Sequence, residues 1–207
     1  MEKIYKREEY LKKIRGFYKD DMIKVITGIR RCGKSYFLKS VIQELIDRGV
    51  PEKDIINIEL DKKGFKNIKT PNQLEKIIDE RITDKDYKYL FIDEVQNVKN
   101  YETLINSYRE EGNISIFITG SNSYLLSGEL MTKLTGRYIE IEMMPLTFNE
   151  YVDMKRFFDK EVNSNIYLEF EEYARNGGFP GSLNYDNYED RRSEERRVGK
   201  ECRSRWS

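Results

Sequence analysis

The chain has 207 residues, of which 38% are hydrophobic and 36% charged, with 37 basic and 37 acidic residues and no histidine. This length suits one well-buried domain and the start of another, and the missing histidine excludes histidine-activated nucleophiles and histidine-rich metal sites. No apolar run approaches the roughly 20 residues that span a bilayer and no signal peptide is visible, so we expect a cytoplasmic protein without a membrane partner.

The first predicted elements surround a glycine-rich segment. Residues 22–27, MIKVIT, have the apolar, β-rich composition of a short buried strand. The segment GIRRCGKS follows, and residues 35–49 then carry apolar side chains at helical spacing up to Gly49. The sequence therefore predicts a strand, a glycine-rich loop and a helix in succession.

The elements that follow alternate between strand and helix. Thr70 and Asn100 are predicted N-caps, Pro71 lies at the first position of its helix, and Gly112 ends the helix that Asn100 begins. We expect strands at 54–60, 87–94, 114–120 and 137–143, and helices at 70–82, 100–112 and 123–134. This alternation predicts a mainly parallel sheet with helices on both faces.

A change in pattern at Pro145 predicts a domain boundary. We expect a first domain at residues 1–145 and a helical region at 146–191, which leads to a second domain. The helical region holds a helix at 147–158, opened by a capping box of Thr147 and Glu150, and another at 165–178 that ends at two glycines.

The glycine-rich loop predicts a phosphate-binding site. The spacing G-x-x-x-x-G-K-S, between a strand and a helix, lets backbone N–H groups converge on phosphates; Lys34 then reaches the β- and γ-phosphates and Ser35 coordinates Mg²⁺. A glycine-rich turn with a surface lysine is the alternative. The predicted nucleotide-binding residues are Gly28, Ile29, Arg30, Arg31, Cys32, Gly33, Lys34, Ser35 and Tyr36.

A second Arg-Arg-x-Gly-Lys segment, ERRVGKEC, occurs at residues 195–202. It has glutamate after its lysine and no strand before it, so we do not expect it to bind phosphate. Residues 192–207 resemble the translation of a common short-read sequencing adapter. We therefore expect a non-native tail there, and a natural sequence that is interrupted near Arg191.

Two carboxylates follow the apolar residues YLFI at the end of the strand predicted at 87–94. Ligands of parallel α/β sheets bind at the carboxyl ends of the strands. Asp93 there can hold Mg²⁺ and Glu94 can orient and deprotonate an attacking water. The alternative is a polar strand end with two solvated carboxylates.

Three further residues are candidates for the same site. Ser121 or Asn122, just after the strand at 114–120, can contact the γ-phosphate or the attacking water, although either also suits a helix N-cap. Arg137 precedes the last strand and can reach a nucleotide on a neighbouring subunit, or form a surface ion pair.

The segments TGIRRCGKS, LFIDEVQ, ITGSNS, LTGRY and PLTFNEY together resemble the AAA+ ATPase superfamily, over roughly residues 4–183. The resemblance is greater to prokaryotic ATPases in which one AAA domain precedes a C-terminal domain of unknown function, and GGFP at residues 177–180 is similar to the junction between the two. We therefore expect this sequence to depart from the family by the loss of that second domain.

The resemblance implies an α/β fold, a P-loop NTPase αβα sandwich with a five-stranded parallel sheet of order 5-1-4-3-2 and a short helical region after it. It makes Gly28, Gly33, Lys34 and Ser35 the Walker A residues, Asp93 and Glu94 the Walker B residues, and Ser121 or Asn122 sensor 1. Arg137 falls in the region of the arginine finger.

These observations predict a protein that binds ATP and Mg²⁺ and hydrolyses ATP to rearrange a homo-oligomer, or a protein or DNA target that the missing domain recognises. A nucleotide-gated switch with negligible turnover, linked to DNA or another partner, is one alternative. A P-loop kinase is another. It would need an arginine-rich lid and an acceptor pocket, whereas this sequence places Asp-Glu at the strand end and offers no obvious lid.

Overall fold

The computed structural model describes residues 3–120, 134 and 136–184. These residues form two compact units. The sheet unit contains residues 6–28, 34–120, 134 and 136–143, and the helical unit contains residues 3–5, 29–33 and 144–184. The domain limits at 145 and 191 inferred from the sequence stay predictions.

A five-stranded parallel sheet forms the centre of the sheet unit. Its order, β2-β3-β4-β1-β5, confirms the expected fold class and the order 5-1-4-3-2. Every residue of β1, β3 and β4 is buried, as expected for inner strands of a parallel sheet. The strands are β1 (Ile23–Gly28), β2 (Ile55–Glu59), β3 (Lys88–Asp93), β4 (Ile114–Thr119) and β5 (Tyr138–Met143).

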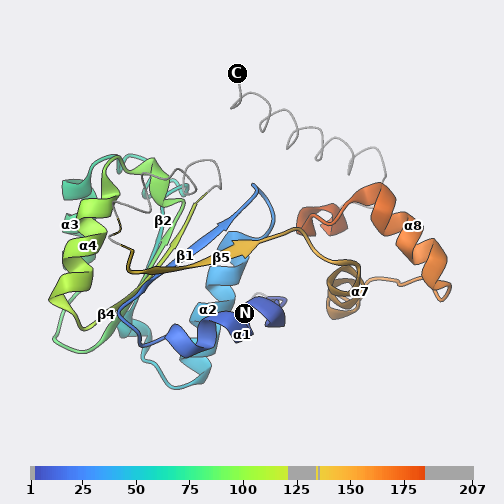
Figure 1. Ribbon diagram of the computed structural model, residues 1–207, viewed down its shortest axis with the longest axis horizontal. Helices are drawn as coiled ribbons and strands as arrows, with labels where there is room; N and C mark the ends of the chain where they lie inside the picture. Colours follow the sequence, from blue (N-terminus) through green and yellow to red (C-terminus); the bar gives the residue numbers. More distant parts are fainter. Residues whose placement is uncertain (1–2, 121–133, 135, 185–207) are drawn as a thin grey trace. The chain divides into compact units, whose positions relative to one another are not determined.

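Helices cover both faces of this sheet. Figure 1 shows α1 (Glu8–Ile14) and α2 (Lys34–Asp47) on one face, and α3 (Pro71–Asp79) and α4 (Tyr101–Glu111) on the other. Short 3₁₀ helices lie between the strands and helices. They are η1 (Arg15–Phe17), η2 (Glu52–Asp54) and η3 (Val95–Asn97).

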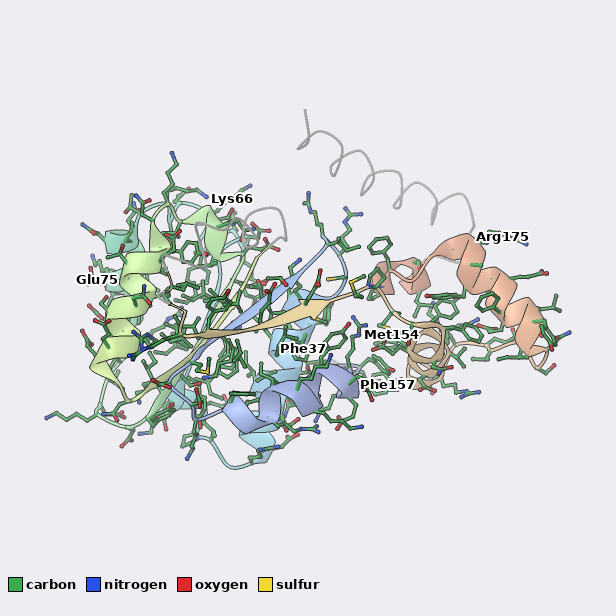
Figure 2. The ribbon with its side chains drawn as sticks, viewed as in Figure 1. Phe37, Lys66, Glu75, Met154, Phe157 and Arg175 are labelled. Carbon is green, nitrogen blue, oxygen red and sulfur yellow. The ribbon has the colours of Figure 1, made fainter. Side chains whose placement is uncertain are left out.

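The alternation of side chains along each strand builds two apolar layers. Leu90 and Ile92 of β3 pack with buried residues of α3 and α4. Phe91, between them, points to the opposite face and stacks on Phe117 of β4 with ring centroids 4.5 Å apart. Side chains fill the space between sheet and helices, including the buried Phe37 of α2 (Figure 2). This packing holds the strand ends in place.

The ends of the predicted helices follow the sequence in most cases. Thr70 and Gln73 form the capping box of α3, and α4 ends at Gly112, whose φ is 75°. Asn100 is the N-cap residue of α4 as predicted, but its side chain forms no capping hydrogen bond and its backbone is left-handed, with φ 56°. Asn100 turns the chain into α4 through its backbone, which asparagine tolerates better than most residues.

Helix α1 was not predicted. Its sequence pattern is only seven residues long. Two fully buried apolar residues, Leu11 and Ile14, lie three positions apart, with acidic residues in the first turn of the helix and lysines in the last. The helix predicted at 123–134 lies outside the described residues except for Leu134, which is buried.

The helical unit contains α7 (Phe148–Phe157), α8 (Ile166–Asn176) and the 3₁₀ helix η4 (Pro180–Asn184). The capping box before α7 is confirmed, since the Thr147 N–H donates to Glu150 Oε2 at 2.9 Å and the Glu150 N–H donates to Thr147 Oγ1 at 3.3 Å. Helix α8 ends at Gly177 as predicted. In the described part of the chain, every helix is too short or too polar to cross a membrane.

Helix α8 turns polar side chains toward α7. Lys155 Nζ donates to Glu169 Oε1 at 2.5 Å, and the Asn163 N–H donates to Glu169 Oε2 at 2.7 Å. Glu169 is fully buried, whereas Ile166 and Phe170 of the same helix are exposed. The contact between the two helices therefore combines this buried ion pair with aromatic packing of Phe148 on Phe170 and of Tyr151 on Tyr173.

Candidate nucleotide-binding site

The candidate site begins where β1 runs into α2. Gly28, the last residue of β1, has φ 144°, and Gly33 has φ 105°, values that residues with a side chain rarely adopt. Lys34, the first residue of α2, is only 4% exposed, and its Nζ donates to the Gly28 carbonyl at 2.9 Å. The lysine thus links the two ends of the loop.

Residues 29–33 form a tight turn. The Cys32 N–H donates to the Ile29 carbonyl at 3.3 Å, and Arg31 has a positive φ of 69°, which is uncommon outside glycine. The thiol of Cys32 is buried, while Arg30 is exposed. A Cβ added to Gly33 would lie 3.7 Å from Cγ of Pro180, the proline of GGFP.

The first turn of α2 carries the next two predicted residues. Ser35 is half-buried, and its hydroxyl has no hydrogen bond within the described ranges. Tyr36 is 52% exposed, with the Lys39 ammonium 4.8 Å above its ring. The free N–H groups and the dipole of a helix N-terminus favour an anion at this position.

Thr119 of the neighbouring strand β4 forms hydrogen bonds with both Asp93 and Glu94. Asp93 ends β3 and is 6% exposed, and its Oδ1 accepts a hydrogen bond from the hydroxyl of Thr119 at 2.5 Å. The same hydroxyl accepts the Glu94 N–H at 2.9 Å. Glu94 has a left-handed backbone, with φ 57°, and its carboxylate accepts a hydrogen bond from the Gln96 amide.

Strand register brings these parts to one edge of the sheet. Strand β4 lies between β3 and β1, and Thr119 is aligned with Ile26 of β1. The Gly120 N–H also donates to the Ile26 carbonyl, at 3.2 Å. Asp93, Thr119 and the end of β1 therefore lie at the carboxyl edge, where ligands of parallel sheets bind.

The donor groups at this edge fit Mg²⁺. Asp93 is buried and pairs with no basic side chain among the residues that the structure describes. A carboxylate and the hydroxyl of Ser35 are hard oxygen ligands of the kind Mg²⁺ prefers. A cation is a suitable counter-charge for a carboxylate in this position.

Other candidates lie elsewhere or outside the described residues. Ser121 and Asn122 fall in the undescribed segment 121–133. Arg137 is exposed, and its carbonyl accepts the N–H of Ile23, the first residue of β1. Since Gly28 is the last residue of β1, roughly 16 Å of strand separates Arg137 from the phosphate loop. Arg137 is therefore remote from the phosphate loop of its own chain.

A second group of carboxylates lies near the start of β3. Oxygens of Asp54, Asp84 and Asp86 come within 4.8 Å of one another. Lys53 Nζ bonds to Asp84 and Asp86, each at 2.8 Å, and Lys88 Nζ bonds to Asp54 at 2.5 Å. The hydrogen bonds that Asp84 accepts from Lys53 above all, and from Lys88, hold the pKa of Asp84 below its ordinary value. The group is an ion-pair network.

Sequence reasoning missed two residues of the site, Thr119 and Gln96. Thr119 is the last residue of an apolar strand, and the predicted role was assigned to the residues just after it. Gln96 lies two positions after Glu94, within LFIDEVQ. A polar residue at the end of a buried strand was the available signal for Thr119.

A parallel sheet whose first strand leads into a glycine loop, with carboxylates at the end of β3, defines the P-loop class of nucleotide-binding proteins. The family model described as AAA domain matches residues 20–152, and the chain belongs to this family. It therefore carries a nucleotide-binding, ATPase-like domain.

The chain is 36% identical over 182 residues to an uncharacterized protein of Haemophilus influenzae, which covers 87% of this chain and 45% of that protein. It spans less than half the length of the curated relatives that it matches.

Solved structures with similar folds include two proteins with an adenine nucleotide or its analogue bound. The Saccharomyces cerevisiae Hsp104–ADP complex aligns with a TM-score of 0.62 and 18% identity, over 86% of this chain and 29% of that chain. AMPPCP-bound DnaA from Aquifex aeolicus aligns with a TM-score of 0.55 and 15% identity, over 85% and 57%. At these identities the likeness concerns the fold.

Proposed function

We propose that the protein binds Mg²⁺-ATP at the carboxyl edge of the sheet and hydrolyses it. The observation that carries the proposal is the arrangement of Lys34, Asp93 and Glu94. Lys34 closes the phosphate loop after β1, and the two carboxylates lie at the same edge of the sheet, two strands away.

Each residue has a role in this proposal. Backbone N–H groups of residues 28–36 and the Lys34 ammonium bind the phosphates. Ser35 and Asp93 would hold Mg²⁺, which supplies positive charge against the phosphate oxygens. Glu94 orients the attacking water and accepts its proton, and Ser121 or Asn122 contacts the γ-phosphate.

Hydrolysis is proposed to rearrange a homo-oligomer or a bound protein or DNA target in the cytoplasm. The fold neighbours were solved with ADP or AMPPCP bound, which supports a nucleotide at this site. The target belongs to the whole protein, since the curated relatives are more than twice as long as their match to this chain.

Titration with a fluorescent ATP analogue tests the site. We expect Lys34→Ala to weaken binding at least tenfold, because the variant loses a buried cation that faces the phosphates. Lys200→Ala is the matched control, since it alters the second Arg-Arg-x-Gly-Lys segment and should leave affinity unchanged. Equal affinity in all three proteins would contradict the assignment of the loop.

Phosphate release then separates an enzyme from a switch. We expect Glu94→Gln to bind Mg²⁺-ATP normally and to hydrolyse it about 10²–10⁴-fold more slowly, because the amide keeps the shape and loses the base. Asp93→Asn should also weaken Mg²⁺-dependent binding. Tight binding by the wild type without any phosphate release would favour the nucleotide-gated switch.

A further inference from the structure

We propose that Thr119 is a positioning residue for ATP hydrolysis, which sets the orientation of both strand-end carboxylates through one hydroxyl group. This inference rests on the proposed function. Thr119 is fully buried, its hydroxyl donates to Asp93 Oδ1 at 2.5 Å, and it accepts the Glu94 N–H at 2.9 Å.

The Thr119 hydroxyl both donates one hydrogen bond and accepts another. A threonine hydroxyl has one donor hydrogen and two acceptor lone pairs. The donor hydrogen goes to one oxygen of Asp93, so the carboxylate has a fixed rotation and its other oxygen has no hydrogen bond to a described residue. That arrangement leaves Asp93 oriented for a cation.

The acceptor side of the hydroxyl acts on Glu94. Glu94 has φ 57°, a conformation that residues with a side chain seldom adopt. Such a conformation persists when the surroundings hold it, and the hydrogen bond from the Glu94 N–H to Thr119 is one contact that does so. Thr119 therefore helps to determine where the proposed base points.

The position of β4 explains why this residue can do both. Strand β4 pairs with β3 on one side and β1 on the other, and Thr119 is in register with Ile26, two residues before Gly28. The hydroxyl thus connects the carboxylates to β4, whose backbone pairs with β1, the strand that leads into the phosphate loop. Without it, β3 and β4 would still pair through their backbones, but the side chain of Asp93 would lose its partner.

Thr119→Val removes the hydroxyl and keeps the shape of the side chain. We expect the apparent affinity for Mg²⁺, measured through binding of a fluorescent ATP analogue, to fall about 10–100-fold, and kcat to fall by a similar factor. Binding of the analogue without Mg²⁺ should stay at the wild-type level. Thr119→Ser restores the hydroxyl and should return both quantities to within about threefold of wild type.

Ser115→Ala is the matched control, because it removes a buried hydroxyl from the opposite end of the same strand, where it accepts a hydrogen bond from Lys24. Its Mg²⁺ dependence should equal that of the wild type. If Thr119→Val fails to fold, Thr119→Ala supplies the same comparison.

Two results would overturn the role of Thr119. One is a wild-type Mg²⁺ dependence and kcat in Thr119→Val. The other is an equal loss in Thr119→Val and Ser115→Ala that follows their thermal stability, which would mark a purely structural hydroxyl. Failure of the proposed function would give another result, because the wild type would then bind the ATP analogue no more tightly than the Lys34→Ala variant does.

Discussion

Replacing Lys24 by methionine is expected to stabilise the protein at neutral pH and to change how its stability depends on pH. Lys24 lies in the middle layer of the sheet and is 0% exposed. Its Nζ donates to the Asp20 carbonyl at 2.7 Å and to Ser115 Oγ at 2.8 Å, and lies 5.2 Å from the centre of the Phe117 ring. Within the described part of the chain no carboxylate forms an ion pair with it.

The structure sets the size of the effect. Burial lowers the pKa of Lys24 from 10.5 to about 8, although Asp20 and Asp21 act in the opposite direction. The folded state therefore releases a proton that the unfolded state keeps, so stability rises as the pH increases from about 8 to 10.5. At pH 7 the buried charge costs about 3 kcal/mol, and about 2 kcal/mol of this is relieved by pH 9.5.

Methionine keeps the unbranched stem and removes the charge, but it leaves Ser115 and the Asp20 carbonyl without their donor, at about 1–2 kcal/mol in total. We expect Lys24→Met to raise the free energy of unfolding by about 1–2 kcal/mol at pH 7. Urea denaturation at pH 7.0 and 9.5 provides the measurement. The advantage of the variant should vanish by pH 9.5. If the difference between the two proteins is the same at both pH values, Lys24 is not a buried charge of this kind.

Gln96→Ala is expected to reduce kcat about tenfold with little change in KM, because Glu94 loses a hydrogen bond to its carboxylate; steady-state phosphate release measures it, and an unchanged kcat would contradict it. Arg137 is expected to act on a neighbouring subunit, so activity per subunit should rise with protein concentration, and mixing Arg137→Ala with Glu94→Gln subunits should restore some activity. No rescue in such mixtures would argue against that role. Lys155→Met should destabilise α7 and α8 by about 3–5 kcal/mol, because it leaves the buried Glu169 carboxylate without its cationic partner. The double variant Lys155→Met, Glu169→Leu should recover most of this loss of stability. Hydrogen exchange in these helices is the readout, and equal protection in the Lys155→Met variant and the wild type would exclude the pair as a stabilising contact.

Local patterns in the sequence were sufficient for most of the fold. Buried parallel strands are continuous apolar runs, so β1, β3 and β4 were visible without any tertiary information. The G-x-x-x-x-G-K-S spacing marked the loop because its glycines carry positive φ angles. Asp93 and Glu94 were likewise visible as carboxylates at the end of an apolar strand.

The family resemblance implied the strand order, but only the tertiary structure decided which side chains meet at the strand ends. Strand pairing places β4 between β3 and β1, and this makes Thr119 the partner of Asp93 although 26 positions separate them in the sequence. Pairing also places Arg137 at the opposite edge from the phosphate loop, a separation that no local pattern encodes. The physical reason is that side-chain type and spacing determine each strand and turn locally, whereas contacts between strand ends depend on the order and register in which the strands pair.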